Sequence, residues 1–192
     1  LLDKTLKDFG NRDDHTDCCI VFVGSHGILT HQREAIMCKD GSLHSVSKIW
    51  KSFDNKHCPQ LRGKPKIFIF QICRGKEPDW CFVAQGPAIY DGHEPSAPGH
   101  FYNSMSDMLT IFACSYGYAA LRDSEGSWMV QGLCQTIEKY HDKYSLVEII
   151  NQTSRWMKNK IGTMNEMQTL TTENMGFDKN FYFSKPRMCS IL

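Results

Sequence analysis

The stretch Ile67-Phe68-Ile69-Phe70-Gln71-Ile72-Cys73-Arg74-Gly75 begins as an apolar run and stops abruptly at a charge and a glycine. Its first four residues show no alternation of polar and apolar side chains, which is typical of a strand covered on both faces of a sheet. Two other segments, 19–23 and 108–113, have the same character. We therefore predict three buried strands, each followed by residues that differ sharply from the run before them.

Apolar side chains at helical spacing lie before, between and after these runs. We expect helices over 2–9, over 46–53 with Ser42 as a possible cap, from about 127 to 140, and from a capping box at 145–148 to near Gly162. A final short run, 181–183, is expected to be an edge strand. Helices that alternate with buried strands predict an α/β fold, a three-layer sandwich around a mostly parallel central sheet.

Composition excludes several classes of function. The chain has 192 residues, with 22 basic and 21 acidic side chains and a net charge of +1, so it carries no electrostatic footprint for nucleic acid. No apolar stretch approaches the roughly 20 residues that span a bilayer. Nine cysteines without a secretory signal or a Cys-x-x-Cys pair favour free thiols in a cytoplasmic protein, with no metal and no cofactor.

Reactive residues follow two of the predicted strands. Segment 19–23 leads into His26 and Gly27, and segment 67–70 leads into Cys73. Because the carboxyl ends of parallel strands meet at one edge of a sheet, His26 and Cys73 are expected to emerge together. An imidazole beside a cysteine can hold the sulfur as thiolate and protonate a leaving amine. The backbone N–H groups of Gly27 and Cys73 could stabilise an oxyanion.

These residues resemble the motifs of the caspase family of cysteine peptidases. The family pattern is Gln-Ala-Cys-[Arg/Gln/Gly]-Gly with a histidine about 50 residues upstream. This chain has Gln71-Ile72-Cys73-Arg74-Gly75, with His26 in a Ser-His-Gly motif 47 residues earlier. Residues 63–66 (GKPK) look like the family's lead-in to the cysteine strand, and residues 117–128 (GYAALRDSEGSW) resemble its small-subunit loop.

The resemblance implies roles for particular residues. Cys73 would be the nucleophile and His26 the general acid/base, with oxyanion donors at Gly27 and Cys73. Family members cut after aspartate, and Gln71 and Arg122 match two residues of the pocket that holds it, where a guanidinium can grip a carboxylate. The pairing of subunits in the family implies a homodimer, or a heterodimer with another caspase. Adaptor or inhibitor proteins are possible partners.

The same resemblance divides the chain. Residues 1–91 would belong to the large subunit, 92–106 to the intersubunit linker, and 107–192 to the small subunit of one catalytic domain. The segment 86–106 has three prolines, three glycines and no periodicity, which suits a linker. Asp91 is the expected cleavage site within it, and Asp79 and Asp107 are weaker candidates.

Three departures from the family pattern stand out. Ile72 replaces a small alanine beside the nucleophile, so its branched side chain must find room in the core. Ala119 and Leu121 stand where aromatic residues usually line the next subsite, which predicts a wider and less selective pocket. A second arginine of the family lies on an earlier strand that this chain lacks, so the first strand of the fold is expected to be missing.

The departures leave more than one function open. The first hypothesis is an aspartate-directed cysteine endopeptidase acting on protein substrates in apoptosis or related signalling. The alternative is a catalytically impaired decoy that dimerises with an active caspase and regulates it. A related peptidase with basic-residue specificity is more remote, because it would need an acidic pocket where Arg122 stands. The C-terminal residues 189–192 (CSIL) fit a prenylation box, although an exposed tail is the simpler reading.

Overall fold

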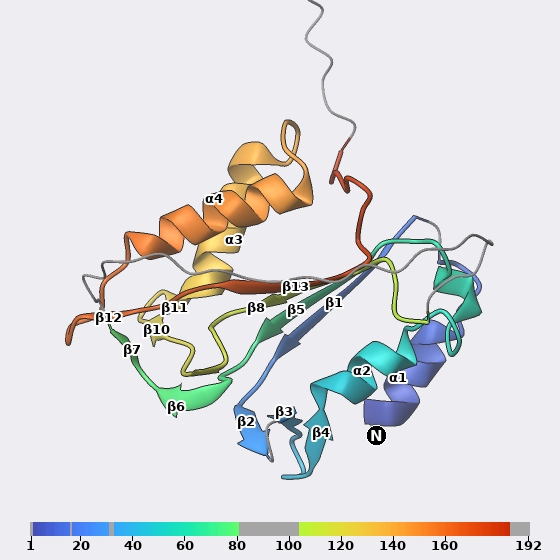
Figure 1. Ribbon diagram of the computed structural model, residues 1–192, viewed down its shortest axis with the longest axis horizontal. Helices are drawn as coiled ribbons and strands as arrows, with labels where there is room; N and C mark the ends of the chain where they lie inside the picture. The colour runs from blue at the N-terminus through green and yellow to red at the C-terminus, as the bar shows by residue number, and fades with distance from the viewer. Residues whose placement is uncertain (1, 16, 31–32, 81–103, 185–192) are drawn as a thin grey trace, which may run out of the picture.

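The centre of the molecule is a four-stranded sheet (Figure 1). The computed structural model describes residues 2–15, 17–30, 33–80 and 104–184. Strands β1 (Cys19–Gly24), β5 (Lys66–Gln71) and β8 (Met108–Phe112) are parallel, and β13 (Thr171–Met175) runs antiparallel to β8. The order β1-β5-β8-β13 places β1 and β13 at the two edges. The three predicted strands and the mostly parallel sheet are confirmed, but β1 is not buried on both faces as predicted, because Ile20 and Phe22 are 43% and 54% exposed on this edge strand.

Helices cover both faces of this sheet (Figure 1). Helices α1 (Leu2–Gly10) and α2 (Val46–Ser52) lie on one side, and α3 (Trp128–Tyr140) and α4 (Leu146–Lys158) on the other. Strand β5 contributes to both cores, because Phe68 and Phe70 pack toward α2 while Ile67 packs toward α3 and α4. Ile72 is 1% exposed, so it does find room in the core. The three-layer α/β sandwich is confirmed.

The ends of two helices differ from expectation. Helix α2 is capped by Ser45, whose hydroxyl accepts a hydrogen bond from the Lys48 N–H, whereas Ser42 bonds to Asp40 in the preceding turn. The predicted cap at Ser42 is therefore wrong by three residues. Helix α4 does begin with the expected capping box of Ser145 and Glu148, but it ends at Lys158, before Gly162.

The prediction of an edge strand at 181–183 is wrong. This segment is irregular, and the carbonyl of Phe181 accepts a hydrogen bond from the N–H of Leu146 at the start of α4. The edge position belongs instead to β13, in which half-buried and exposed residues alternate. Phe181 packs on the α3–α4 core, which explains an apolar run outside a strand.

Short strands gather beyond the carboxyl ends of β1, β5 and β8 (Figure 1). One antiparallel sheet has β2 (Gly27–Thr30), β3 (Arg33–Met37) and β4 (Leu43–Ser45). Three pairs complete the set: β6 (Gly75–Glu77) with β9 (Gly117–Tyr118), β7 (Asp79–Trp80) with β12 (Glu166–Met167), and β10 (Arg122–Asp123) with β11 (Gly126–Ser127). These strands frame the candidate site.

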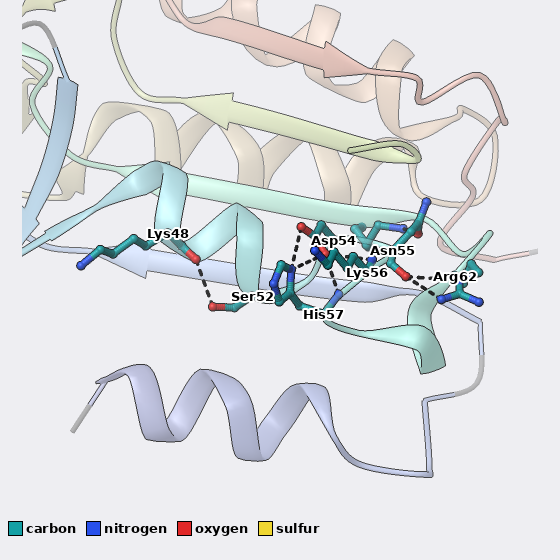
Figure 2. Close-up of polar contacts among 8 residues, drawn as sticks. Lys48, Ser52, Asp54, Asn55, Lys56, His57 and Arg62 are labelled. Carbon is teal, nitrogen blue, oxygen red and sulfur yellow. Dashed lines mark hydrogen bonds and ion pairs between the residues drawn. The ribbon is translucent and has the colours of Figure 1, made fainter. Parts of the chain in front are cut away.

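A hydrogen-bonded turn fixes the amino end of β5 (Figure 2). The buried carboxylate of Asp54 accepts from the His57 N–H at 2.7 Å and from His57 Nδ1 at 2.8 Å, and Arg62 donates to the Asn55 carbonyl. The turn leads through the 3₁₀ helix η1 (Pro59–Leu61) to the buried Lys66, whose Nζ donates to Asn55 Oδ1. Burial lowers the pKa of the Lys66 ammonium. The strand that ends near Cys73 is therefore anchored at its other end.

Several expectations fall outside the described residues. Most of the predicted linker, including the cleavage site at Asp91, lies in 81–103, and the box that begins at Cys189 lies in 185–192. The subunit division stays a prediction. None of the helices in the described ranges has the length and the apolar character of a membrane-spanning segment.

Candidate active site

The parallel register of β1 and β5 brings His26 and Cys73 to one edge of the sheet. Gly24 pairs with Gln71 at the end of this ladder, and His26 and Cys73 each follow two residues later. The N–H of Ser25 continues the pairing by donating to the Gln71 carbonyl at 3.3 Å. The two chains therefore leave the sheet side by side, as the sequence predicts.

Gly27 packs directly on the backbone of Cys73. A Cβ atom at Gly27 would overlap the Cys73 carbonyl and lie 2.9 Å from the Cys73 nitrogen, a distance that real side chains do not reach. Gly75 is equally close to Gly117, since a Cβ there would overlap the Gly117 carbonyl. Only glycine allows these chains to approach so closely. Two glycines thus fix the position of the cysteine loop between β2 and β9.

The thiol of Cys73 is free and half-buried. Its sulfur accepts a hydrogen bond from the N–H of Ala120 at 3.4 Å. The adjacent Ala119 donates to the Glu77 carbonyl at 2.8 Å, so the segment after β9 runs past the nucleophile candidate. Leu121, next along this segment, is held through its N–H by the Gln168 side chain. The structure therefore brings Ala120 into contact with the cysteine, and Ala119 and Leu121 are its neighbours in the chain.

His26 is exposed and lines a large cavity. The cavity has a volume of about 1020 Å³ and is bounded by the end of β1, by β3 and by α1. The backbone of His26 is fixed by its carbonyl, which accepts from the Met37 N–H at 2.9 Å, and Ser25 donates to the Met37 carbonyl. A cavity of this size can accommodate peptide side chains. His26 thus lies on the wall of this cavity, whereas Cys73 does not line it.

The two proposed pocket residues differ in their surroundings. The side-chain oxygen of Gln71 is buried and has no hydrogen-bond partner in the part of the chain that the structure describes. Arg122 lies on β10 and is exposed, and its side chain makes no hydrogen bond or ion pair with another described residue. A buried acceptor without a partner is costly unless a ligand donates a hydrogen bond to it. Both side chains therefore have polar groups that a substrate could use, although no contact joins them here.

Arg74 is a site residue whose role the sequence does not reveal. It is 5% exposed, and its guanidinium bonds Glu34 on β3 and Glu173 on β13, the latter at 2.8 Å. The same group lies 3.9 Å from the ring centroid of Phe112. Arg74 thus links the hairpin that follows His26 to the sheet edge on the far side of Cys73. Arg74 is part of the motif around Cys73, but no sequence pattern identifies its partners, which are distant in the chain.

The other candidates remain outside this cluster. Asp79 on β7 accepts from Thr169, and Asp107 precedes β8 with a positive φ of 59°. Across 2–15, 17–30, 33–80 and 104–184, no group of three or more His, Cys, Asp or Glu side chains could hold a metal ion. The chemistry that this arrangement can supply is that of a thiol, an imidazole and backbone N–H groups.

Comparisons with known proteins agree with this geometry. A family model described as “Caspase domain” matches residues 2–182. Caspase Dronc of Drosophila melanogaster is 31% identical over 185 residues, which cover 88% of this chain and 41% of that protein. Caspase-2 of Gallus gallus is 30% identical over 178 residues, covering 84% of this chain and 40% of that protein. This chain thus spans less than half the length of these two curated relatives.

A solved structure shares the fold. The crystal structure of caspase-1 from Spodoptera frugiperda superposes with a TM-score of 0.78 at 21% identity, covering 97% of this chain and 71% of that one. At this identity the likeness concerns the fold, and the sequence relatives carry the family assignment.

Proposed function

This chain belongs to the caspase family, and we propose that it acts as a cysteine endopeptidase that cuts after aspartate. Cys73 is the nucleophile and His26 the general acid/base. The observation that carries the proposal is the register of β1 and β5, which makes His26 and Cys73 leave the sheet side by side, with Gly27 packed on the Cys73 backbone. This arrangement suits nucleophilic catalysis by a cysteine–histidine pair.

The reaction proceeds in two steps. The Cys73 sulfur, having passed its proton to His26, adds to the carbonyl carbon of the scissile bond, and the backbone N–H groups of Gly27 and Cys73 stabilise the oxyanion. The carbon–nitrogen bond breaks as His26 gives the proton to the leaving amine. Water then attacks the thioester, His26 takes its proton, and the thiol is restored when that proton returns to sulfur.

Aspartate specificity rests on Gln71 and Arg122. The Nε2 group of the Gln71 amide and the guanidinium of Arg122 can each donate hydrogen bonds to a carboxylate, whereas the unpaired Oε1 of Gln71 is an acceptor and needs a donor of its own. Ala119 and Leu121 offer small and aliphatic side chains beside them, so the adjoining subsite accepts varied residues. We further propose that the chain is cleaved at Asp91, is located in the cytoplasm and dimerises through the edge strand β13. Its substrates are proteins of apoptosis or related signalling.

The test is labelling and cleavage with matched thiol variants. The purified protein is treated with a peptide that carries an electrophile after aspartate, alongside Cys73→Ala and Cys134→Ala. Cys134 is an exposed free thiol on α3, so it reports nonspecific alkylation. We expect labelling to vanish in Cys73→Ala and to persist in Cys134→Ala. Equal labelling of all three proteins, or none in the unaltered protein, would refute the proposal.

A regulatory partner of another caspase is the second candidate. The hydrogen bond from Ala120 to the Cys73 sulfur, and the absence of side-chain hydrogen bonds from Arg122 to other described residues, favour a site that is not assembled for catalysis. This candidate predicts that Cys73→Ala keeps the protein's effect on a partner caspase. Loss of that effect in the variant would count against it.

A further inference from the structure

Asp123, the residue after Arg122, has more polar partners than an exposed turn requires. Its carboxylate accepts from Lys160 Nζ at 2.6 Å, from Gln131 Nε2 at 2.7 Å and from Trp128 Nε1 at 3.1 Å. The N–H of Glu125 donates to it at 2.9 Å within the turn. These donors come from the hairpin itself, from α3 and from the residues just after α4. One side chain therefore joins three parts of the fold.

The partners of Asp123 are also bonded to one another. Lys160 donates to Gln131 at 2.8 Å as well as to Asp123, and Gln131 donates to the Gly126 carbonyl. The Lys160 ammonium lies 5.0 Å from the ring centroid of Trp156 and 5.6 Å from that of Trp128. Such closed networks hold their members in one arrangement more firmly than isolated pairs do.

The hairpin that this network holds is intrinsically weak. Strands β10 and β11 have two residues each, with Arg122 paired to Ser127. Two-stranded hairpins are marginal in water without further packing. The side chain of Arg122 is exposed and makes no hydrogen bond or ion pair with another described residue, so it does not fix the hairpin. The position of the guanidinium thus depends on its neighbour.

We propose that Asp123 is a positioning residue, which locks the β10–β11 hairpin onto α3 and the end of α4 and thereby sets where Arg122 meets the substrate carboxylate. The inference rests on the proposed aspartate specificity. It assigns Asp123 and Lys160 no contact with the substrate. Their effect passes through Arg122 alone.

The test is a double-mutant cycle with peptide cleavage as the readout. Asp123→Asn should raise KM for a peptide cut after aspartate by about 10- to 100-fold with a smaller change in kcat, because a displaced charge binds the carboxylate less well. In an Arg122→Ala background the same substitution should have no further effect. Glu125→Gln is the matched control, because that carboxylate lies in the same turn and contacts the Ser124 hydroxyl at 3.5 Å.

A second variant guards against misfolding. Lys160→Met keeps a side chain over the two tryptophan rings but removes the ammonium, and it should reproduce the rise in KM, whereas Lys160→Arg should restore most of the affinity. Equal effects of Asp123→Asn in both Arg122 backgrounds, or no effect of either variant in an active protein, would overturn the inference. Absence of cleavage by the unaltered protein would instead refute the proposed function, and the inference with it.

Discussion

Replacement of Arg74 by methionine should destabilise the whole fold. Arg74 is 5% exposed and pairs with Glu34, whose side chain is 17% exposed, and with Glu173, which is 39% exposed. Removal of one partner from a buried ion pair costs about 3–5 kcal/mol, because the remaining charge stays unpaired. Glu173 can regain water, so we expect the lower end, a loss of about 3 kcal/mol in the free energy of unfolding.

The assay is urea and thermal unfolding of matched variants. For a chain of this size, about 3 kcal/mol lowers the unfolding midpoint by roughly 6–12 °C. Arg12→Met is the control, because Arg12 pairs with Asp14 on the surface, where both side chains are more than half exposed, and no measurable shift is expected. Adding Glu34→Gln to Arg74→Met should recover about 1 kcal/mol, since a neutral amide replaces the unpaired carboxylate. A loss below about 1 kcal/mol for Arg74→Met would refute the reasoning.

Three other predictions concern single positions. Gly27→Ala should abolish peptide cleavage even where the protein still folds, because the added Cβ overlaps the Cys73 backbone. Cleavage near the rate of the unaltered protein would contradict this prediction. Ser145→Ala should lower the free energy of unfolding by about 1 kcal/mol through loss of the capping box, measured in urea, with no change expected for Ser124→Ala in an exposed turn. The pKa of Asp123 is lowered to about 2, chiefly by the hydrogen bond from Lys160, against a usual value of 3.8. A carboxyl whose folded pKa is lowered contributes stability above its unfolded pKa and loses it as the pH falls toward the folded one. The gap in unfolding midpoint between the unaltered protein and Asp123→Asn should therefore close between about pH 4 and pH 2, and a constant gap across this range would argue against the pair.

Much of the fold could be predicted because a buried strand appears in the sequence as an uninterrupted apolar run. The uninterrupted apolar runs of β5 and β8 indicate covered parallel strands, and the abrupt ends of β1 and β5 place His26 and Cys73 at one edge. The similar run of β1 wrongly predicted a strand buried on both faces, since Ile20 and Phe22 are exposed. Strand β13 has no such apolar run and could not be predicted, because its residues Thr171–Met175 are mostly polar and lie at a sheet edge. The apolar segment 181–183 was wrongly predicted to be a strand, because its apolar side chains pack on helices instead.

The side-chain networks could not be predicted, because they join residues far apart in sequence. Arg74 meets Glu34 and Glu173 across 40 and 99 residues, and Asp123 meets Lys160 across 37. The tertiary fold brings these pairs together, and no local sequence pattern around one residue predicts its partner. The position of Arg122 relative to Gln71 likewise depends on how a hairpin of two-residue strands docks, which its sequence does not determine.

The central claim is that His26 and Cys73 form a working catalytic pair with a pocket for aspartate. The most direct measurement is cleavage of a peptide library by the purified protein, with Cys73→Ala and His26→Ala in parallel. We predict cuts after aspartate, with broad tolerance at the residue before it, that disappear in both variants. Cleavage that survives Cys73→Ala, cuts after other residues, or no cleavage by the folded protein would contradict the account.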